Sequence, residues 1–208
     1  CARARLPAAR GPWRLFMEAR FEEAVELAER RLARAEDRAP QEAGRAHNVT
    51  SICLSRLGRH AEARTHALQG LAQARAAGDL NTEGAILTNM GLGDTDANRV
   101  TQALDCYAQA LAAYQAAGSR QGIANVQVNL GQTEINLGRM HKAQGLLQQA
   151  VQTCQEIGAG RLEAMARANL GVALYELGQP QDAYDTALEG LRLARISGEV
   201  RTEAWAHH

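Results

Sequence analysis

Lysine is almost absent from this 208-residue chain: of its 23 basic residues, only Lys142 is a lysine. This excludes a phosphate-binding loop with its lysine and leaves a single candidate for Schiff-base chemistry. Serine is scarce too, and none of Ser51, Ser55, Ser119 and Ser197 lies in a nucleophile-elbow motif. We therefore expect no catalytic residue in this chain and predict that it is not an enzyme.

Other absences exclude further classes. The four cysteines form no Cys-x-x-Cys pair and have no histidine at zinc-finger spacing, which predicts buried free thiols in a reducing compartment. Acidic and basic residues balance at 23 each, so no net charge attracts nucleic acid or an anionic membrane. The sequence also lacks a membrane-spanning apolar run and the apolar core of a signal peptide. These features predict a cytoplasmic protein without a cofactor.

Two groups of residues contain side chains of the kinds that bind metal ions, but neither group has the sequence pattern of a metal site. Asp94, Asp96 and Asn98 have the spacing of an EF-hand loop, but Arg99 stands where that loop needs glycine. We instead expect the end of a helix there. The histidines His47, His60, His66 and His141 are interpreted as surface or helix-end residues, and no metal is predicted.

A repeat of forty residues dominates what is present. Residues 41–200 divide into four blocks, 41–80, 81–120, 121–160 and 161–200, with glycine recurring at Gly78, Gly118, Gly158 and Gly198. Aromatic residues make up only 4% of the chain, and its wealth of Ala, Leu, Glu, Gln and Arg favours helix. Self-similarity at a fixed period is the signature of stacked helix pairs that offer an extended binding surface.

Each block is predicted to hold two helices. The first helices are expected at 42–57, 82–97, 122–137 and 162–177, and the second at 60–77, 100–117, 140–157 and 180–197. Each first helix should end at a left-handed residue, namely Gly58, Asn98, Gly138 or Gly178. The tightest packing is expected at four alanines, Ala63, Ala103, Ala143 and Ala183.

The ends of the chain depart from this pattern. Residues 1–20 are predicted to be an irregular segment or an end cap. Residues 21–40 resemble the second helix of a partial repeat, and residues 201–208 the start of a truncated further helix. The chain reads as a fragment of a larger protein, and its two final histidines are either native or part of a tag.

The order of residues in Ala166-Arg167-Ala168-Asn169-Leu170-Gly171, and in Leu137-Gly138-Arg139 followed by Ala143, resembles the tetratricopeptide repeat. The forty-residue period is similar to the subclass found in kinesin light chains, Leu-Gly-Asn-repeat adaptors and bacterial regulators. The resemblance implies an all-α, right-handed superhelix whose first helices line a concave groove. The aromatic residue that often opens this family's first helix is replaced here. His47, Leu87, Gln127 and Arg167 stand in its place.

The groove positions of that family fall on one face of each first helix in this chain. The candidate peptide-binding residues are Arg45, Arg56, Asn89, Asn125, Asn129, Gln132, Asn136, Asn169 and Glu176. Asn89, Asn129 and Asn169 recur once per repeat, and an amide can pair with both the N–H and the C=O of an extended peptide. The arginines would make one end of the groove basic, and Glu176 would make the other acidic. The alternative for the asparagines is a bond to the backbone of a neighbouring helix.

The sequence thus favours a scaffold that binds a protein or an extended peptide. A second interpretation is a ligand-sensing or peptide-sensing regulatory domain, as in a bacterial transcriptional regulator or signalling protein. Formation of a homodimer through the exposed ends of the array is a third.

Overall fold

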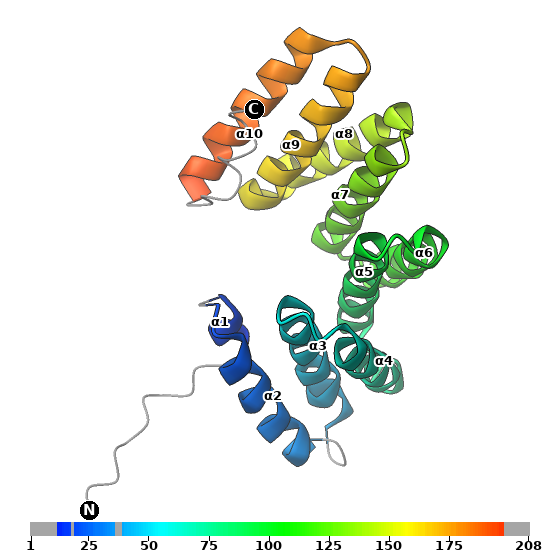
Figure 1. Ribbon diagram of the computed structural model, residues 1–208, viewed down its shortest axis with the longest axis vertical. Coiled ribbons are helices and arrows are strands. Elements are labelled where there is room, and N and C mark those ends of the chain that lie inside the picture. The colour runs from blue at the N-terminus through cyan, green and yellow to red at the C-terminus, as the bar shows by residue number, and fades with distance from the viewer. Residues whose placement is uncertain (1–11, 18, 36–38, 198–208) are drawn as a thin grey trace, which may run out of the picture. The chain divides into compact units, whose positions relative to one another are not determined.

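The structure is a computed structural model that describes residues 12–17, 19–35 and 39–197. Within these ranges every regular element is an α-helix (Figure 1). The helices are α1 (Pro12–Met17), α2 (Phe21–Ala35), α3 (Pro40–Arg56), α4 (His60–Ala76), α5 (Leu80–Asp96), α6 (Val100–Ala116), α7 (Arg120–Asn136), α8 (Met140–Ile157), α9 (Gly160–Glu176) and α10 (Pro180–Ser197). The prediction of an all-α array of helix pairs is confirmed.

The predicted helices differ from the observed ones by at most two residues at each end. Each first helix starts two residues earlier than expected. In α3 and α7, the residues at this end suit the start of a helix. Pro40 lies in the first turn of α3, where its missing N–H costs no hydrogen bond. Ser119 caps α7 by accepting a hydrogen bond from the Gly122 amide.

The turns inside the repeats depend on residues with positive φ. Gly58, Asn98, Gly138 and Gly178 all adopt φ between 56° and 76°, as predicted. In the first of these turns the Gly58 amide donates to the Ser55 carbonyl, and the next amide, of Arg59, reaches back to the Leu54 carbonyl at 2.9 Å. These bonds satisfy carbonyls that the end of the helix leaves open. Gly78, Gly118 and Gly158 are also left-handed, whereas Gly198 lies outside the described residues.

The chain divides into two compact units, residues 1–93 and 94–208. In unit 1, α3 packs against α1, α2 and α4, and one core cluster joins these helices. Its buried members are Leu15, Ala24, Val25, Cys53, Leu54 and Ala63. In unit 2, α8 packs against both α7 and α9, and α9 also contacts α7 and α10.

Small residues set the close approach of helices within each unit. The four alanines expected at the tightest points, Ala63, Ala103, Ala143 and Ala183, are buried. Gly131 of α7 also lies close to its neighbour: a Cβ added there would come 2.5 Å from the Leu147 side chain of α8. A larger residue at this place requires either Leu147 or the helices themselves to move.

The N-terminal helices follow the repeat at a spacing of 39 residues. Ala19 is left-handed with φ 57°, as Gly58 is in the next turn with φ 76°, and the Arg20 amide donates to the Leu15 carbonyl at 2.9 Å. Arg20 also forms an ion pair with Glu23 three residues on, as Arg59 does with Glu62. Part of the segment expected to be an irregular region or an end cap is thus the short helix α1, in which Leu15 is buried. Residues 1–11 and 201–208 lie outside the described residues.

Candidate peptide-binding face

The polar stripe of α7 consists of Asn125, Asn129, Gln132 and Asn136, at spacings that place them on one side of the helix. Their amides form two pairs. Asn129 Nδ2 donates to Asn125 Oδ1 at 3.5 Å, and Gln132 Nε2 donates to Asn136 Oδ1 at 3.0 Å. Each pair uses one amide nitrogen and one amide oxygen, so a donor and an acceptor remain for an outside group.

The equivalent stripe of α9 lies in the same unit and is more apolar. Met165 is 36% exposed, Asn169 and Val172 are half-buried, and Glu176 is exposed. Because α9 packs against α7, the two stripes belong to neighbouring helices. Together they offer amide donors and acceptors beside apolar side chains, with Glu176 as the one charged member of the two stripes.

Asn89, the first member of the asparagine series, lies in unit 1 and bonds to a different partner. Its Nδ2 donates to Oδ1 of Asn48 on α3 at 3.1 Å. Asn89 thus bonds a side chain on a neighbouring helix, whereas the alternative interpretation expected a bond to the backbone there. Its Oδ1 and the Nδ2 of Asn48 are not used in that bond.

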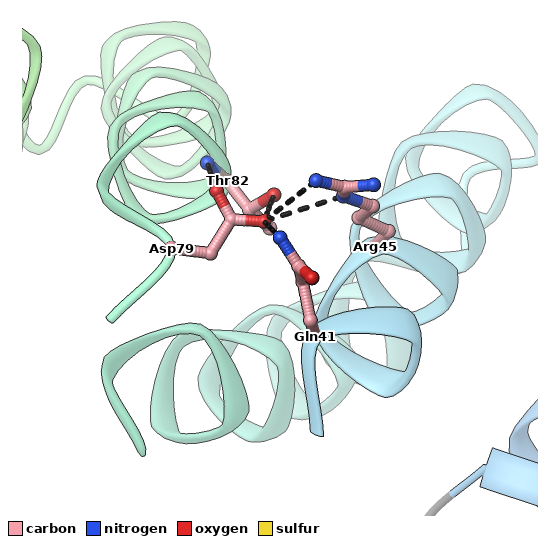
Figure 2. Close-up of polar contacts among 4 residues, drawn as sticks. All are labelled: Gln41, Arg45, Asp79 and Thr82. Atoms are coloured by element: carbon pink, nitrogen blue, oxygen red, sulfur yellow. Dashed lines mark hydrogen bonds and ion pairs between the residues drawn. The ribbon is translucent and has the colours of Figure 1, made fainter. Parts of the chain in front are cut away.

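Arg45 on α3 is tied to a polar cluster, shown in Figure 2. Its Nε and Nη2 donate to Asp79 Oδ2 at 3.2 and 3.0 Å, and Gln41 Nε2 donates to the same oxygen at 3.1 Å. Asp79 also caps α5, because its Oδ1 accepts from the Thr82 amide at 3.1 Å. Burial acts to raise the pKa of Asp79, but the bonds from Thr82, Gln41 and Arg45 together hold it below its usual value.

This cluster changes the predicted charge at that end of the face. The side chain of Asp79 is only 6% exposed, and its negative charge lies against the Arg45 guanidinium. The positive charge of Arg45 is therefore largely neutralised by Asp79. Arg56, the other arginine among the candidate binding residues, is exposed and lies outside this cluster. The sequence missed the pairing because Asp79 lies in the turn before α5, 34 residues from Arg45.

The interpretation of His47 as a surface or helix-end residue is wrong. His47 is buried, and its Nδ1 lies 3.0 Å from Nδ1 of His66 on α4, with ring centroids 5.2 Å apart. Burial, followed by the nearby His66, lowers the pKa of His47 to about 4. The alignment of the repeats could have indicated this burial, because His47 stands at the position where the tetratricopeptide repeat often has an aromatic residue.

The burial of the Asp94 and Glu134 carboxylates was not predicted from the sequence. Asp94 and Glu134 stand forty residues apart and are 1% and 0% exposed. Asp94 Oδ1 accepts from Arg99 Nε at 2.7 Å, and Glu134 Oε1 accepts from Lys142 Nζ at 2.7 Å. Asp94 thus serves the end of a helix, and no cluster of three or more metal-ligand residues occurs in the part of the chain that the structure describes. No helix among those residues is long and apolar enough to cross a bilayer.

Stacked antiparallel helix pairs with left-handed turns define the chain as an α-solenoid built from helical repeats. Residues 122–196 match the family model of the tetratricopeptide repeat. Residues 122–196 are therefore similar to the tetratricopeptide repeat, as the sequence predicted, and the chain has the fold of such repeats, which generally serves as a protein–protein interaction scaffold.

Solved structures of similar proteins share this fold. BtubC (BKLC) from P. vanneervenii matches with a TM-score of 0.74 and 19% identity, over 90% of this chain and 78% of that one. TTC0263, a thermophilic tetratricopeptide repeat protein of Thermus thermophilus, matches with a TM-score of 0.64 and 20% identity, over 95% and 96%. A putative kinesin light chain of Podospora anserina with nearly identical repeats matches at 0.63 and 17%, over 89% and 92%. No curated protein matches the sequence.

Proposed function

We propose that this protein is an interaction scaffold that binds an extended segment of a partner along the stripes of α7 and α9. The observation that carries the proposal is the pairing of the α7 amides, which leaves one donor and one acceptor in each pair. An extended peptide presents N–H and C=O groups at regular intervals along its length. Amides held in this way meet both kinds of group without selecting a charge.

The neighbouring helix contributes the second part of the binding face. Asn169 adds another amide, and Met165 and Val172 provide apolar surface for side chains of the bound segment. Because Glu176 is the one charged residue of these stripes, we expect uncharged or weakly basic segments to bind better than acidic ones. Main-chain hydrogen bonds would then supply affinity, and the apolar contacts would supply selectivity.

The experiment is a selection of linear peptides from a display library on the wild-type chain, followed by affinity measurement with variants of the amides. We expect Asn129→Ala and Asn169→Ala each to weaken binding of a selected peptide about fivefold, the factor for one hydrogen bond of ~1 kcal/mol. Gln148→Ala is the matched control, because this exposed amide lies on α8 and outside both stripes. It should bind like the wild type.

Equal affinity of the wild type and both asparagine variants, with all three folded, would refute recognition by this face. A chain that selects no peptide, but is stabilised against heat by a small molecule, would instead favour the ligand-sensing regulator. Circular dichroism at each step shows whether a variant has kept its helices.

A further inference from the structure

Helix α10, the last helix labelled in Figure 1, has an outer face that points away from α9. This face consists of Gln181, Asp185, Leu188, Arg192 and Ile196, whose spacings of three and four residues place them on one side of the helix. All five side chains are exposed, Leu188 by 51% and Ile196 by 71%. Among the described helices α10 packs against α9 alone, so none of them covers this face.

The apolar residues of this face distinguish α10 from the second helices of the other full repeats. At the places of Leu188 and Ile196, those helices have at most one large apolar residue. The corresponding pairs are Leu68 and Ala76 in α4, Ala108 and Ala116 in α6, and Gln148 and Glu156 in α8. In α10, Tyr184 adds a further large side chain, 63% exposed, one turn before Leu188. One exposed leucine is ordinary on a protein surface, but large apolar residues that gather on one helix indicate a contact surface.

The charges of this face complement a second copy of the same face. Asp185 lies before Leu188 and Arg192 lies after it. An antiparallel copy of α10 centred near Leu188 therefore brings Asp185 of each chain beside Arg192 of the other. Both side chains are already held in place within their own helix. Gln181 Nε2 donates to Asp185 at 3.2 Å, and Arg192 Nε donates to Glu189 at 2.8 Å. They can thus form a further ion pair with little additional loss of freedom.

We propose that the outer face of α10 is a self-association surface, on which a second copy of this chain packs its own α10 in the antiparallel direction. The two Leu188 side chains then meet near the two-fold axis, and the pairs of Asp185 with Arg192 flank them. Because one helix of each chain makes the contact, the buried area is small and the dimer depends on concentration.

This association goes beyond the proposed peptide binding and does not compete with it. The stripes that we propose for peptide binding lie on α7 and α9, and the outer face of α10 contains none of their residues. A dimer therefore presents two sets of stripes. A partner that carries its recognised segment twice would bind the dimer more tightly than the monomer.

Sedimentation of the wild-type chain over a range of concentrations tests the association. The average mass should rise toward that of a dimer. Leu188→Gln, which introduces the residue found in α8, should raise the dissociation constant by about tenfold, because two copies of this leucine leave the interface at once. Leu68→Gln is the matched control, since Leu68 is 50% exposed at the same place of α4. It should not change the dissociation constant. A wild type that stays monomeric, or an equal loss of dimer in both variants, would overturn the proposal.

Charge reversal tests the antiparallel arrangement. Asp185→Arg and Arg192→Asp each place like charges together in the dimer, so either variant alone should remain monomeric. An equimolar mixture of the two should form a heterodimer, because every arginine at these positions then meets an aspartate of the other chain. Circular dichroism shows whether each variant keeps its helices. A mixture that stays monomeric while the wild type dimerises would refute the proposed contact.

Discussion

Acid should weaken unit 1 through His47, because this buried imidazole must remain neutral in the folded chain. Its Nδ1 lies 3.0 Å from that of His66, so protonation of both rings would place two positive charges side by side. Burial first, and then His66, lowers the pKa of His47 from 6.5 to about 4. A base with a folded pKa below its unfolded value contributes full stability above pH 6.5 and loses it as the pH falls toward 4.

The size of the effect follows from the two pKa values. Between pH 7 and pH 5 the unfolded chain takes up most of one proton at His47, while the folded chain takes up almost none. Linkage then lowers the free energy of unfolding by about 1.8 kcal/mol over this range, approaching ~3.4 kcal/mol at lower pH. This loss is a large part of the stability of an ordinary domain.

The assay is urea denaturation of the wild type and of His47→Leu at pH 7, 6 and 5. Leucine is a fair replacement because Leu87 occupies the same place in the next repeat and is buried. Between pH 7 and pH 5, the free energy of unfolding of the variant should fall by about 1.8 kcal/mol less than that of the wild type. The comparison of the two proteins cancels the contribution of the other titrating groups. Since burial is the larger cause, His66→Ala should keep most of the His47 effect, and the NMR titration of His47 in that variant should still lie well below 6.5. If the wild type and His47→Leu lose the same stability, the reasoning is refuted.

Three further outcomes can be checked by the same denaturation assay at neutral pH. Ala19→Gly should stabilise the chain by about 1 kcal/mol, because glycine adopts the left-handed φ of 57° without the Cβ clash, and an unchanged midpoint would contradict this. Replacing Glu134 by Leu should be neutral or stabilising, whereas Lys142→Met should cost about 1–3 kcal/mol by weakening the support of a buried charge; the reverse order would refute this account. Gly131→Ala should destabilise by about 1–3 kcal/mol through its clash with Leu147, and Leu147→Val should recover part of the loss only if that contact is the cause.

The array could be predicted from the sequence because its local rules agree with one another. The forty-residue period, the left-handed residues and the small residues at helix contacts all indicate the same helix pairs. Even Asn98, the one departure among the first turns, adopts the expected conformation with φ 56°. Such features need no knowledge of distant contacts, so a single sequence is enough to find them.

The features that were not predicted depend on contacts between residues far apart in the sequence, or on a departure from the repeat pattern. Helix α1 was hidden because Ala19 replaces glycine in its turn and because its repeat is one residue shorter than the others. The bond between Arg45 and Asp79 joins residues 34 apart, which no local pattern indicates. Binding of a partner by the α7 amides depends on the chemical groups of that partner, which are not encoded in this sequence.

The repeats share one fold but differ at the position where the family often has an aromatic residue. In the full repeats this place holds His47, Leu87, Gln127 or Arg167. His47 and Gln127 bond to His66 and Gln149 on the next helix, whereas Arg167 bonds to Glu163 within its own helix. Stacked repeats of one design carry a risk of pairing with the wrong neighbour, as in domain swapping. Helix α8 lies two repeats of forty residues after α4, so Leu146 corresponds to His66. If α3 paired with α8 instead of α4, Leu146 would therefore lie beside His47. The buried Nδ1 of His47 would then lack its partner, at a cost of about 1–3 kcal/mol. A common apolar residue would carry no such penalty, so the polar residues at this place in α3 and α7 favour correct pairing of these helices with α4 and α8.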